Sequence, residues 1–485
     1  MLTSMAVQLV IAMELGAGAE RDSLFVAMSV PLFLNMLLVS TVGVVITPAV
    51  LSHRDPAVQR RMVLRVLLYL GLGTAALAGT LYGVRAAFVD LLAPGFNGAN
   101  RALTTELLAV AVMIMPVQAA ASVLGGYLVA RERILLPNVA LSAGNTLTLA
   151  GILCLGRALT ARDVVLATLA GAVLVLVIQA VALFVRRASL DSAVEADGTP
   201  GTGFGRFYKQ AMPLVLSGLV SRSMPLVERN LASSMGVGTI SWLGYAGYMV
   251  YFLVNATTAP TATAYFAPMC NLWNEGRREQ VGAILESNLL IVLTVALTGG
   301  GLFVVAGSEV LQALALNTKF TPADVAEFVT YGRFLMVAYV FLACGGLLSR
   351  LFYVAGASLQ MAVLDCLATG FYVVAAFLLA RGFTGRGLAV AVSLHSIVVT
   401  ALFVRWARRQ FVQRLRGEFF GRVTGVALKW SAVFAAALAG KHLSGLPEIP
   451  GTALGAAVYA LGAAWLVRIV WRQSGVRWHD DRLAT

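Results

Sequence analysis

Long apolar stretches, broken by short polar or turn-forming segments, run along almost the whole chain. A helix that crosses a bilayer needs about 20 mostly apolar residues, so each stretch is a candidate membrane span. We expect fourteen such helices, at about 1–15, 24–51, 66–84, 107–129, 134–155, 164–185, 211–234, 239–270, 281–306, 331–355, 359–380, 388–404, 423–440 and 449–467. The pattern therefore predicts an all-α polytopic membrane protein.

The amino-acid composition strengthens this prediction. Of the 485 residues, 59% are hydrophobic and only 12% are charged, and the mean hydropathy is +0.83. Soluble domains are much less apolar. The net charge of +13 would suggest nucleic-acid binding in a soluble protein, but basic residues collect in the cytoplasmic loops of membrane proteins. We therefore expect no nucleic-acid partner.

The distribution of lysine and arginine predicts the orientation of the helices. With the N-terminus inside, the inner connections hold 22 of these residues and the outer connections hold 9. Positive charge favours the cytoplasmic side of a membrane protein. We expect a multi-pass protein of the inner (cytoplasmic) membrane with both termini in the cytoplasm.

The first predicted helix is short. The 15 residues before Gly16 would form a helix of about 22 Å, whereas the hydrocarbon core is about 30 Å thick. They also include Glu14, and they lack the basic segment and cleavage site of a signal peptide. Either this helix is tilted and faces a cavity or, as we expect, an upstream in-frame start supplies further apolar residues.

An internal repeat divides the chain. At an offset of 220 residues, Gly and Pro recur at equivalent places in the helix pattern: Gly16 with Gly236, Gly18 with Gly238, Pro48 with Pro268, Gly125 with Gly345 and Gly126 with Gly346. The offset spans six predicted helices, an even number, so both copies have the same orientation in the membrane, as in transporters with parallel repeats. We expect two six-helix lobes around a central cavity, followed by two further helices.

The predicted parts follow from this repeat. The N-lobe covers 1–185 and the C-lobe covers 211–404, and a polar, Gly-rich cytoplasmic linker at 186–210 separates them. Residues 405–485 form a basic connection, the last two helices and a cytoplasmic tail.

The seventh predicted helix carries most of the charge inside the hydrocarbon. Arg222, Pro225 and Arg229 recur at helical spacing and would share one face. Two guanidiniums on one face suit a diphosphate, because the planar guanidinium pairs bidentately with phosphate oxygens. Glu228 would bind a cation or a proton, or neutralise an arginine. An ion pair between helices without any ligand is the alternative explanation.

Other polar residues in or near the predicted spans are weaker candidates, Asp22 and Asn35 for substrate binding and Asp365 for ion coupling. Asp22 stands at an outer helix end beside Glu20 and Arg21, where solvation is the ordinary explanation. Asp365 near the inner end of the eleventh helix is a second candidate for ion coupling. Asn35 suits a hydrogen bond between helices. The arginine-rich stretch 405–422 fits a cytoplasmic connection that rests on anionic lipid.

Several chemistries have no matching sequence motif. The chain has no phosphate-binding P-loop and no arrangement typical of a catalytic triad or carboxylate pair. Its four cysteines lack CxxC spacing and its four histidines are scattered, so we expect no metal site. These observations favour a secondary transporter over an enzyme, without a bound cofactor and driven by the membrane potential or an ion gradient.

Several segments in family order resemble the MviN/MurJ lipid II flippases of the multidrug/oligosaccharidyl-lipid/polysaccharide exporter superfamily. They are GAGAERDSLFVA (16–27), PAVLS (48–52), APGF (93–96), ERNLASSMGVGTISWLGYA (228–246), KFTPADV (319–325), RLFYVAG (350–356) and GRGLAVAVSLH (385–395). The resemblance implies a flippase for peptidoglycan biosynthesis, and we expect it to be a monomer. By alternating access, it would move an undecaprenyl-diphosphate-linked sugar across the inner membrane.

Departures from the family pattern concern the substrate and the coupling ion. The cavity arginines of the peptidoglycan-precursor flippases are replaced here by Val7, Asn35 and Tyr248, while Asp22 and the Glu228–Arg229 pair match the family. Ala376 stands where the sodium-site residues of the eleventh helix would be, so the resemblance does not support sodium coupling. A flippase for exopolysaccharide or O-antigen repeat units, and an ion-coupled drug exporter, therefore remain alternative functions.

Overall fold

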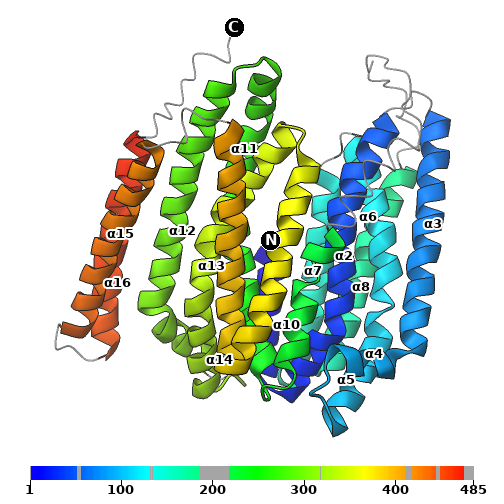
Figure 1. Cartoon of the computed structure of the whole chain (residues 1–485). Helices are drawn as coiled ribbons and strands as arrows, with labels where there is room; N and C mark the ends of the chain where they lie inside the picture. The colour runs from blue at the N-terminus through cyan, green and yellow to red at the C-terminus, as the bar shows by residue number, and fades with distance from the viewer. Residues whose placement is uncertain are drawn as a thin grey trace. The chain divides into compact units, whose positions relative to one another are not determined.

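The computed structural model describes residues 2–51, 56–131, 133, 135–185, 218–316, 318–410, 418–443 and 448–473. Every regular element in these ranges is a helix (Figure 1). They are α1 (Leu2–Leu15), α2 (Ala19–Leu51), α3 (Pro56–Gly83), α4 (Arg85–Leu92), α5 (Gly98–Ala111), α6 (Ile114–Ala130), α7 (Leu135–Leu155), the 3₁₀ turn η1 (Gly156–Ala158), α8 (Ala161–Val185), α10 (Met224–Ala232), α11 (Thr239–Asn274), α12 (Arg278–Ala315), α13 (Pro322–Val354), α14 (Ser358–Gln410), α15 (Glu418–Leu443) and α16 (Glu448–Gln473).

The helices confirm the all-α, polytopic fold class. Within the described ranges, ten helical segments are long and apolar enough to cross a membrane. The segment Ser358–Arg409 holds the eleventh and twelfth predicted helices together. Thr384 separates the two halves, because its φ of 52° and ψ of −141° are not helical.

The chain forms two compact units. The first consists of Met1–Tyr245 and Asn317–Asp324, and the second of Ala246–Leu316 and Val325–Thr485. The chain passes from the first unit to the second within α11. The predicted linker at 186–210 lies outside the described residues, so the predicted division into lobes stays a prediction.

Small residues bring helices close together in the first unit. A side chain at Gly144 of α7 would meet the carbonyl oxygen of Gly171 of α8 at 2.7 Å from its Cβ. Nearby, the Thr148 hydroxyl donates to the Ala167 carbonyl at 3.1 Å. Small residues and hydroxyl groups of this kind are typical of contacts between membrane helices, where backbones must approach closely.

Glycines at the starts of the long helices support the predicted repeat. Gly16 precedes α2 with a φ of +70°, and its repeat partner Gly236 precedes α11 with a φ of +117°. Gly238 has a φ of +90°. Such values are unfavourable for residues with a Cβ, so both copies need glycine in the link before their long helix.

The C-terminal helices pack against α12 in the second unit (Figure 1). The core of this joint consists of the buried side chains of Val305, Ala437, Tyr459 and Ala463. A side chain at Gly462 of α16 would clash with Val433 of α15, so the two helices of the hairpin are in close contact.

Candidate functional site

Asp22 lies at the centre of a buried polar cluster in the first unit. Only 2% of its surface is exposed, although α2 begins three residues before it. Its carboxylate accepts hydrogen bonds from the backbone N–H of Gly238 at 2.6 Å and from the N–H and hydroxyl of Ser241 at 2.8 and 2.5 Å. A carboxylate at a helix N-terminus satisfies free N–H groups and opposes the helix dipole. Asp22 therefore caps α11.

Arg21, the neighbour of Asp22, is also buried, with 3% of its surface exposed. One guanidinium nitrogen of Arg21 donates to the side-chain oxygen of Gln8 at 3.0 Å. The Nε of Arg21 has no hydrogen-bond partner within the described residues. The guanidinium lies 4.1 Å from the ring centroid of Phe25 and 4.9 Å from that of Tyr245. Two aromatic faces thus hold a cation that keeps one donor unused.

Arg229 approaches the same phenylalanine from α10. It is 8% exposed, and its Nε donates to the Phe25 carbonyl at 3.1 Å. Its Nη1 donates to the Pro225 carbonyl at 2.9 Å, and its guanidinium lies 5.8 Å from the Phe25 ring. Among the described residues, neither Arg229 nor Arg21 makes a direct ion pair with a carboxylate.

A short segment after α12 supports the cluster from the other side of Tyr245. Phe320 meets the Tyr245 ring edge to face at 5.8 Å, and the Trp242 indole donates to Asp324 at 3.0 Å. The backbone N–H of Lys319 donates to the Met13 carbonyl at 2.9 Å. The segment 318–324 is therefore part of the first unit's polar core. It contains residues 319–324 of the KFTPADV motif (319–325).

The other predicted residues of the seventh helix have different surroundings. Residues 211–217 lie outside the described part of the chain, and a turn at Arg222 and Ser223 precedes α10. Pro225 is in the first turn of α10, where its missing N–H costs least. Arg222 is exposed while Arg229 is buried, so the seven-residue spacing does not give the two arginines a common environment.

Three further candidates lie outside the cluster's hydrogen-bond network. Glu228 and Asn35 are half-buried, and within the described residues no hydrogen bond or ion pair of their side chains is seen. Asp365 belongs to the second unit, where its carbonyl accepts a hydrogen bond from Thr369 at 2.9 Å. Their roles in substrate binding or ion coupling stay predictions.

Sequence reasoning missed Arg21 and Ser241 as parts of the site. A charged triplet at the start of a helix usually faces water, so the residues Glu20, Arg21 and Asp22 gave no local sign of burial. The signal that could have found Arg21 is its spacing of four residues from Phe25, which places both on one helical face. The partners at Gly238 and Ser241 are more than 200 residues away along the chain.

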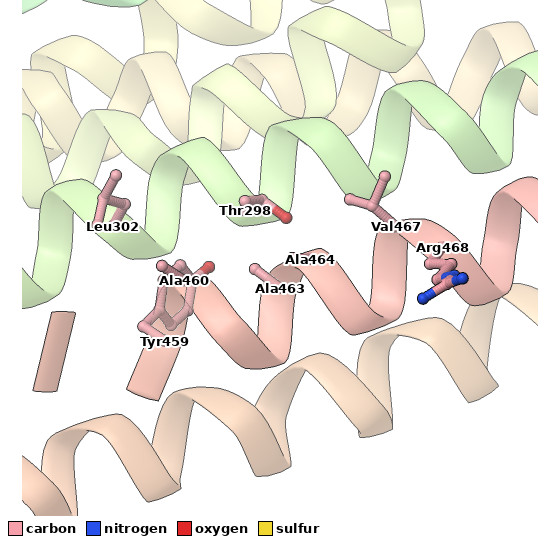
Figure 2. A pocket seen from close by; sticks show the side chains of 8 residues that line it. All are labelled: Thr298, Leu302, Tyr459, Ala460, Ala463, Ala464, Val467 and Arg468. Carbon is pink, nitrogen blue, oxygen red and sulfur yellow. The ribbon is translucent and has the colours of Figure 1, made fainter. Parts of the chain in front are cut away.

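Two pockets lie in the second unit. The larger, of about 640 Å³, runs between α12 and α16 and is lined by Thr298, Leu302, Tyr459, Ala460, Ala463, Ala464, Val467 and Arg468. Figure 2 shows Tyr459 and Arg468 at opposite ends of this row. The smaller pocket, of about 430 Å³, is lined by residues that include Arg422 and Lys429.

Solved membrane transporters share this fold. A lipid II flippase MurJ in an inward closed conformation matches with a TM-score of 0.78 and 15% identity, over 97% of both chains. A multidrug resistance MATE family transporter of the MOP superfamily, in an inward-facing conformation, matches with a TM-score of 0.70 and 17% identity, over 84% of this chain and 94% of the transporter. At these identities, the likeness concerns the fold alone.

Sequence comparison identifies relatives of this chain and its family. The chain is 25% identical over 228 residues to a probable lipid II flippase MurJ of Buchnera aphidicola, covering 45% of this chain and 43% of the relative. It is 23% identical over 202 residues to a probable lipid II flippase MurJ of Bdellovibrio bacteriovorus, covering 40% and 38%. The alignments thus span less than half of these relatives. The family model of the lipid II flippase MurJ matches residues 11–461, and the chain therefore belongs to the MurJ lipid II flippase family.

Proposed function

We propose that this protein is a flippase that moves an undecaprenyl-diphosphate-linked glycan of the lipid II type across the inner membrane by alternating access. The observation that carries the proposal is the pair of buried guanidiniums, Arg21 and Arg229, beside the Phe25 ring. Burying a cation is unfavourable unless it is paired. Within the described residues neither cation has a carboxylate at hydrogen-bond distance, so the pair suits an anionic ligand, and a diphosphate supplies oxygens for both.

In this arrangement, Asp22 closes the proposed phosphate-binding site. Its carboxylate occupies the N–H groups of α11 to which a phosphate would otherwise bind. The burial of Asp22 and Arg21 means that a substrate reaches these groups only after the first turn of α11 moves away. A diphosphate that replaced Asp22 at this helix N-terminus would favour the open state, which is the differential affinity that alternating access requires.

The test is direct measurement of flipping in liposomes that contain the purified protein. We expect a fluorescent lipid II to move between the leaflets, and unlabelled lipid II to compete with it. The same lipid carrier without its diphosphate should neither move nor compete. Movement that is insensitive to removal of the diphosphate would contradict the proposal.

An exopolysaccharide or O-antigen repeat unit is the second candidate substrate. The observation in its favour is Val7, which is apolar and buried. By the resemblance, Val7 stands at the position of a cavity arginine of the peptidoglycan-precursor flippases. Fewer cations suit a less acidic head group. Faster flipping of a lipid diphosphate that carries a neutral oligosaccharide than of lipid II, in the same liposomes, would select this candidate.

The orientation is part of the proposal, with both termini in the cytoplasm. Asn97 and Glu275 are exposed residues in connections that the charge distribution assigns to the outer and inner side. Single cysteines at these positions, in a cysteine-free protein, should react oppositely with an impermeant thiol reagent added to intact cells. Labelling of both from outside would contradict the orientation.

We further propose that the membrane potential, rather than sodium, drives transport. In the same liposomes, flipping should then follow an imposed potential and ignore a sodium gradient. Dependence on sodium alone would contradict this source of energy.

Anionic lipid is the proposed partner at the predicted cytoplasmic side of the second unit. The exposed side chains of Lys429 and Arg468 have no hydrogen-bond or ion-pair partner among the described residues, and arginines gather at the end of α14. Basic residues near a membrane surface attract anionic head groups. Replacing phosphatidylglycerol by phosphatidylcholine in the liposomes should lower the melting temperature or the flipping rate, and no change in either would argue against this partner.

A further inference from the structure

The hairpin of α15 and α16 contacts α12 at three levels along its length, all within the second unit. At the first level, Arg422 of α15 pairs with Glu286 of α12 at 2.9 Å. At the third level, Lys441 of α15 pairs with Glu309 at 2.6 Å, and the Thr452 hydroxyl of α16 donates to the same carboxylate oxygen at 2.7 Å. Both helices of the hairpin therefore hold α12.

The middle level is uncharged. The Trp430 indole donates to the Tyr459 hydroxyl at 2.6 Å, and this hydroxyl donates to the Leu297 carbonyl of α12 at 2.8 Å. The Trp430 ring also stacks on Phe434, with centroids 5.1 Å apart. Tyr459 stands at one end of the row of α16 residues that faces α12 in Figure 2.

Tyr459 and Trp430 fit against a glycine triplet in α12. A Cβ at Gly301 would lie 2.1 Å from the Tyr459 hydroxyl and 2.8 Å from Trp430, which is too close for any other residue. A Cβ at Gly299 would lie 3.4 Å from the hydroxyl of Tyr339 in α13. The triplet Gly299–Gly301 is thus the place where aromatic side chains of three neighbouring helices, α13, α15 and α16, reach α12.

Three consecutive glycines are a point of weakness in a helix. Glycine has the largest backbone freedom, and kinks in long helices occur at glycine as well as at proline. Yet α12 is one continuous helix from Arg278 to Ala315. The hairpin contacts α12 on both sides of the triplet, at Leu297 through Tyr459 and at Val305 through Lys441, whose ammonium donates to that carbonyl at 2.9 Å.

We propose that α15 and α16 form a brace that holds α12 straight across Gly299–Gly301, with Tyr459 as the positioning residue. The proposal goes beyond the flippase function and does not depend on it. The brace acts through two kinds of contact, since the ring of Tyr459 fills the space beside Gly301 and its hydroxyl fixes the Leu297 carbonyl. Removing the hydroxyl alone should loosen α12 while the hairpin stays packed.

The test measures the shape of α12 with two spin labels. Val295 and Val310 are exposed residues of α12 on either side of the triplet, and a straight helix sets their backbones about 22 Å apart. In a cysteine-free protein labelled at both positions, we expect one narrow distance distribution. Tyr459→Phe should broaden it and shift it towards shorter distances, and Tyr459→Ala should do so further.

Tyr69→Phe is the matched control, because Tyr69 is 73% exposed on α3. It should leave the distance distribution unchanged. If Tyr459→Phe and Tyr459→Ala both keep the narrow distribution, the brace does not exist. A lower melting temperature together with an unchanged distribution would give Tyr459 a purely stabilising role and would also overturn the proposal.

Transport kinetics supply a second measurement. Because Tyr459 positions α12 within the second unit, whereas the arginine cluster belongs to the first unit, Tyr459→Phe should lower the maximal flipping rate several-fold without changing the half-saturating concentration of lipid II. If the protein flips nothing, the flippase proposal fails while the distance measurement still tests the brace.

Discussion

The charged side chains discussed in the two units differ in their partners. In the first unit, Arg21 and Arg229 lie against Phe25 without a direct carboxylate partner in the described part of the chain, and Asp22 is engaged with α11. At the joint of the second unit, Glu286 and Glu309 each have a cation at hydrogen-bond distance. Removing one member of a buried ion pair lowers the stability of the folded protein. Paired charges at a helix joint therefore indicate a structural role. Guanidiniums that are buried against an aromatic ring, with no carboxylate at hydrogen-bond distance within the described residues, are candidates for a binding site.

The largest effect should come from the two cations of the first unit. A charge-assisted hydrogen bond to phosphate contributes about 1.5–3 kcal/mol, so Arg21→Ala and Arg229→Ala should each weaken substrate binding by at least about tenfold. Together they should abolish measurable flipping in liposomes. Lysine at either position should rescue only in part, because it keeps the charge but loses the planar fork.

Arg222→Ala is the matched control for these variants. Its side chain is exposed, and we expect a smaller loss of flipping than for Arg229→Ala. Membrane abundance and melting temperature show whether each variant folds. Equal losses for Arg222 and Arg229, in folded protein, would support the common binding face expected from the sequence and would weaken the contrast between buried and exposed arginines.

The second effect concerns the cap of α11. Asp22→Ala leaves two backbone N–H groups and the Ser241 hydroxyl without an acceptor in a buried place. The loss of a cap costs about 0.5–2 kcal/mol, and unsatisfied buried donors raise the cost to roughly 2–3 kcal/mol. The melting temperature of the purified protein measures this loss, and Asp22→Asn should recover part of it.

A partly exposed cap provides the control. Asp163 accepts hydrogen bonds from the backbone N–H and hydroxyl of Thr160 at the start of α8, at 3.0 and 2.6 Å. Because water can replace its carboxylate, Asp163→Ala should lower the melting temperature less than Asp22→Ala. The reverse order would show that the burial of Asp22 adds nothing to its role as a cap.

The third effect tests whether the charges of the second unit are structural. Lys441 and Glu309 have side chains that are 12% and 14% exposed, so Lys441→Met should cost about 1–3 kcal/mol by leaving the carboxylate without its cation. In the double variant with Glu309→Gln the loss should be smaller than the sum of the single losses. A double-mutant cycle on melting in detergent measures the difference, and strict additivity would mean that the pair is not coupled.

The smallest effect is expected at the surface. Arg101 pairs with Asp90 at the end of α4, and this hydrogen bond lowers the pKa of the Asp90 carboxyl. A lowered pKa in the folded state stabilises the protein above the ordinary pKa of an aspartate, and the contribution disappears as the pH falls through the lowered value. Because both side chains are exposed, we expect Asp90→Asn to leave the melting temperature at pH 7 unchanged. A clearly lower melting temperature would show that even this exposed ion pair stabilises the protein.

The helices could be predicted from the sequence because their signals are local. The apolar runs placed the spans, and the break predicted between residues 380 and 388 corresponds to the non-helical Thr384 within α14. The repeat predicted a glycine link before each long helix, and Gly16 and Gly236 share a positive φ.

The polar cluster could be predicted only in part. Asp22 and Arg229 were found as charges near or inside apolar runs, but the contacts that define their roles join residues far apart in the chain. Neither the capping of α11 by Asp22 nor the burial of Arg21 follows from the residues beside them. Arg222 shows the opposite error, because helical periodicity gave it a shared face that the turn at this position removes.

The joint in the second unit also relates the protein to the thickness of its bilayer. The two carboxylates of α12 that hold the hairpin, Glu286 and Glu309, are about 35 Å apart along the helix axis, slightly more than the roughly 30 Å of a typical hydrocarbon layer. Because both ion pairs lock α12, α15 and α16 in one register, the three helices cannot slide to match a different membrane and must tilt as one body. A thicker bilayer would draw a charge pair into the acyl chains, at a cost that rises with each ångström of mismatch.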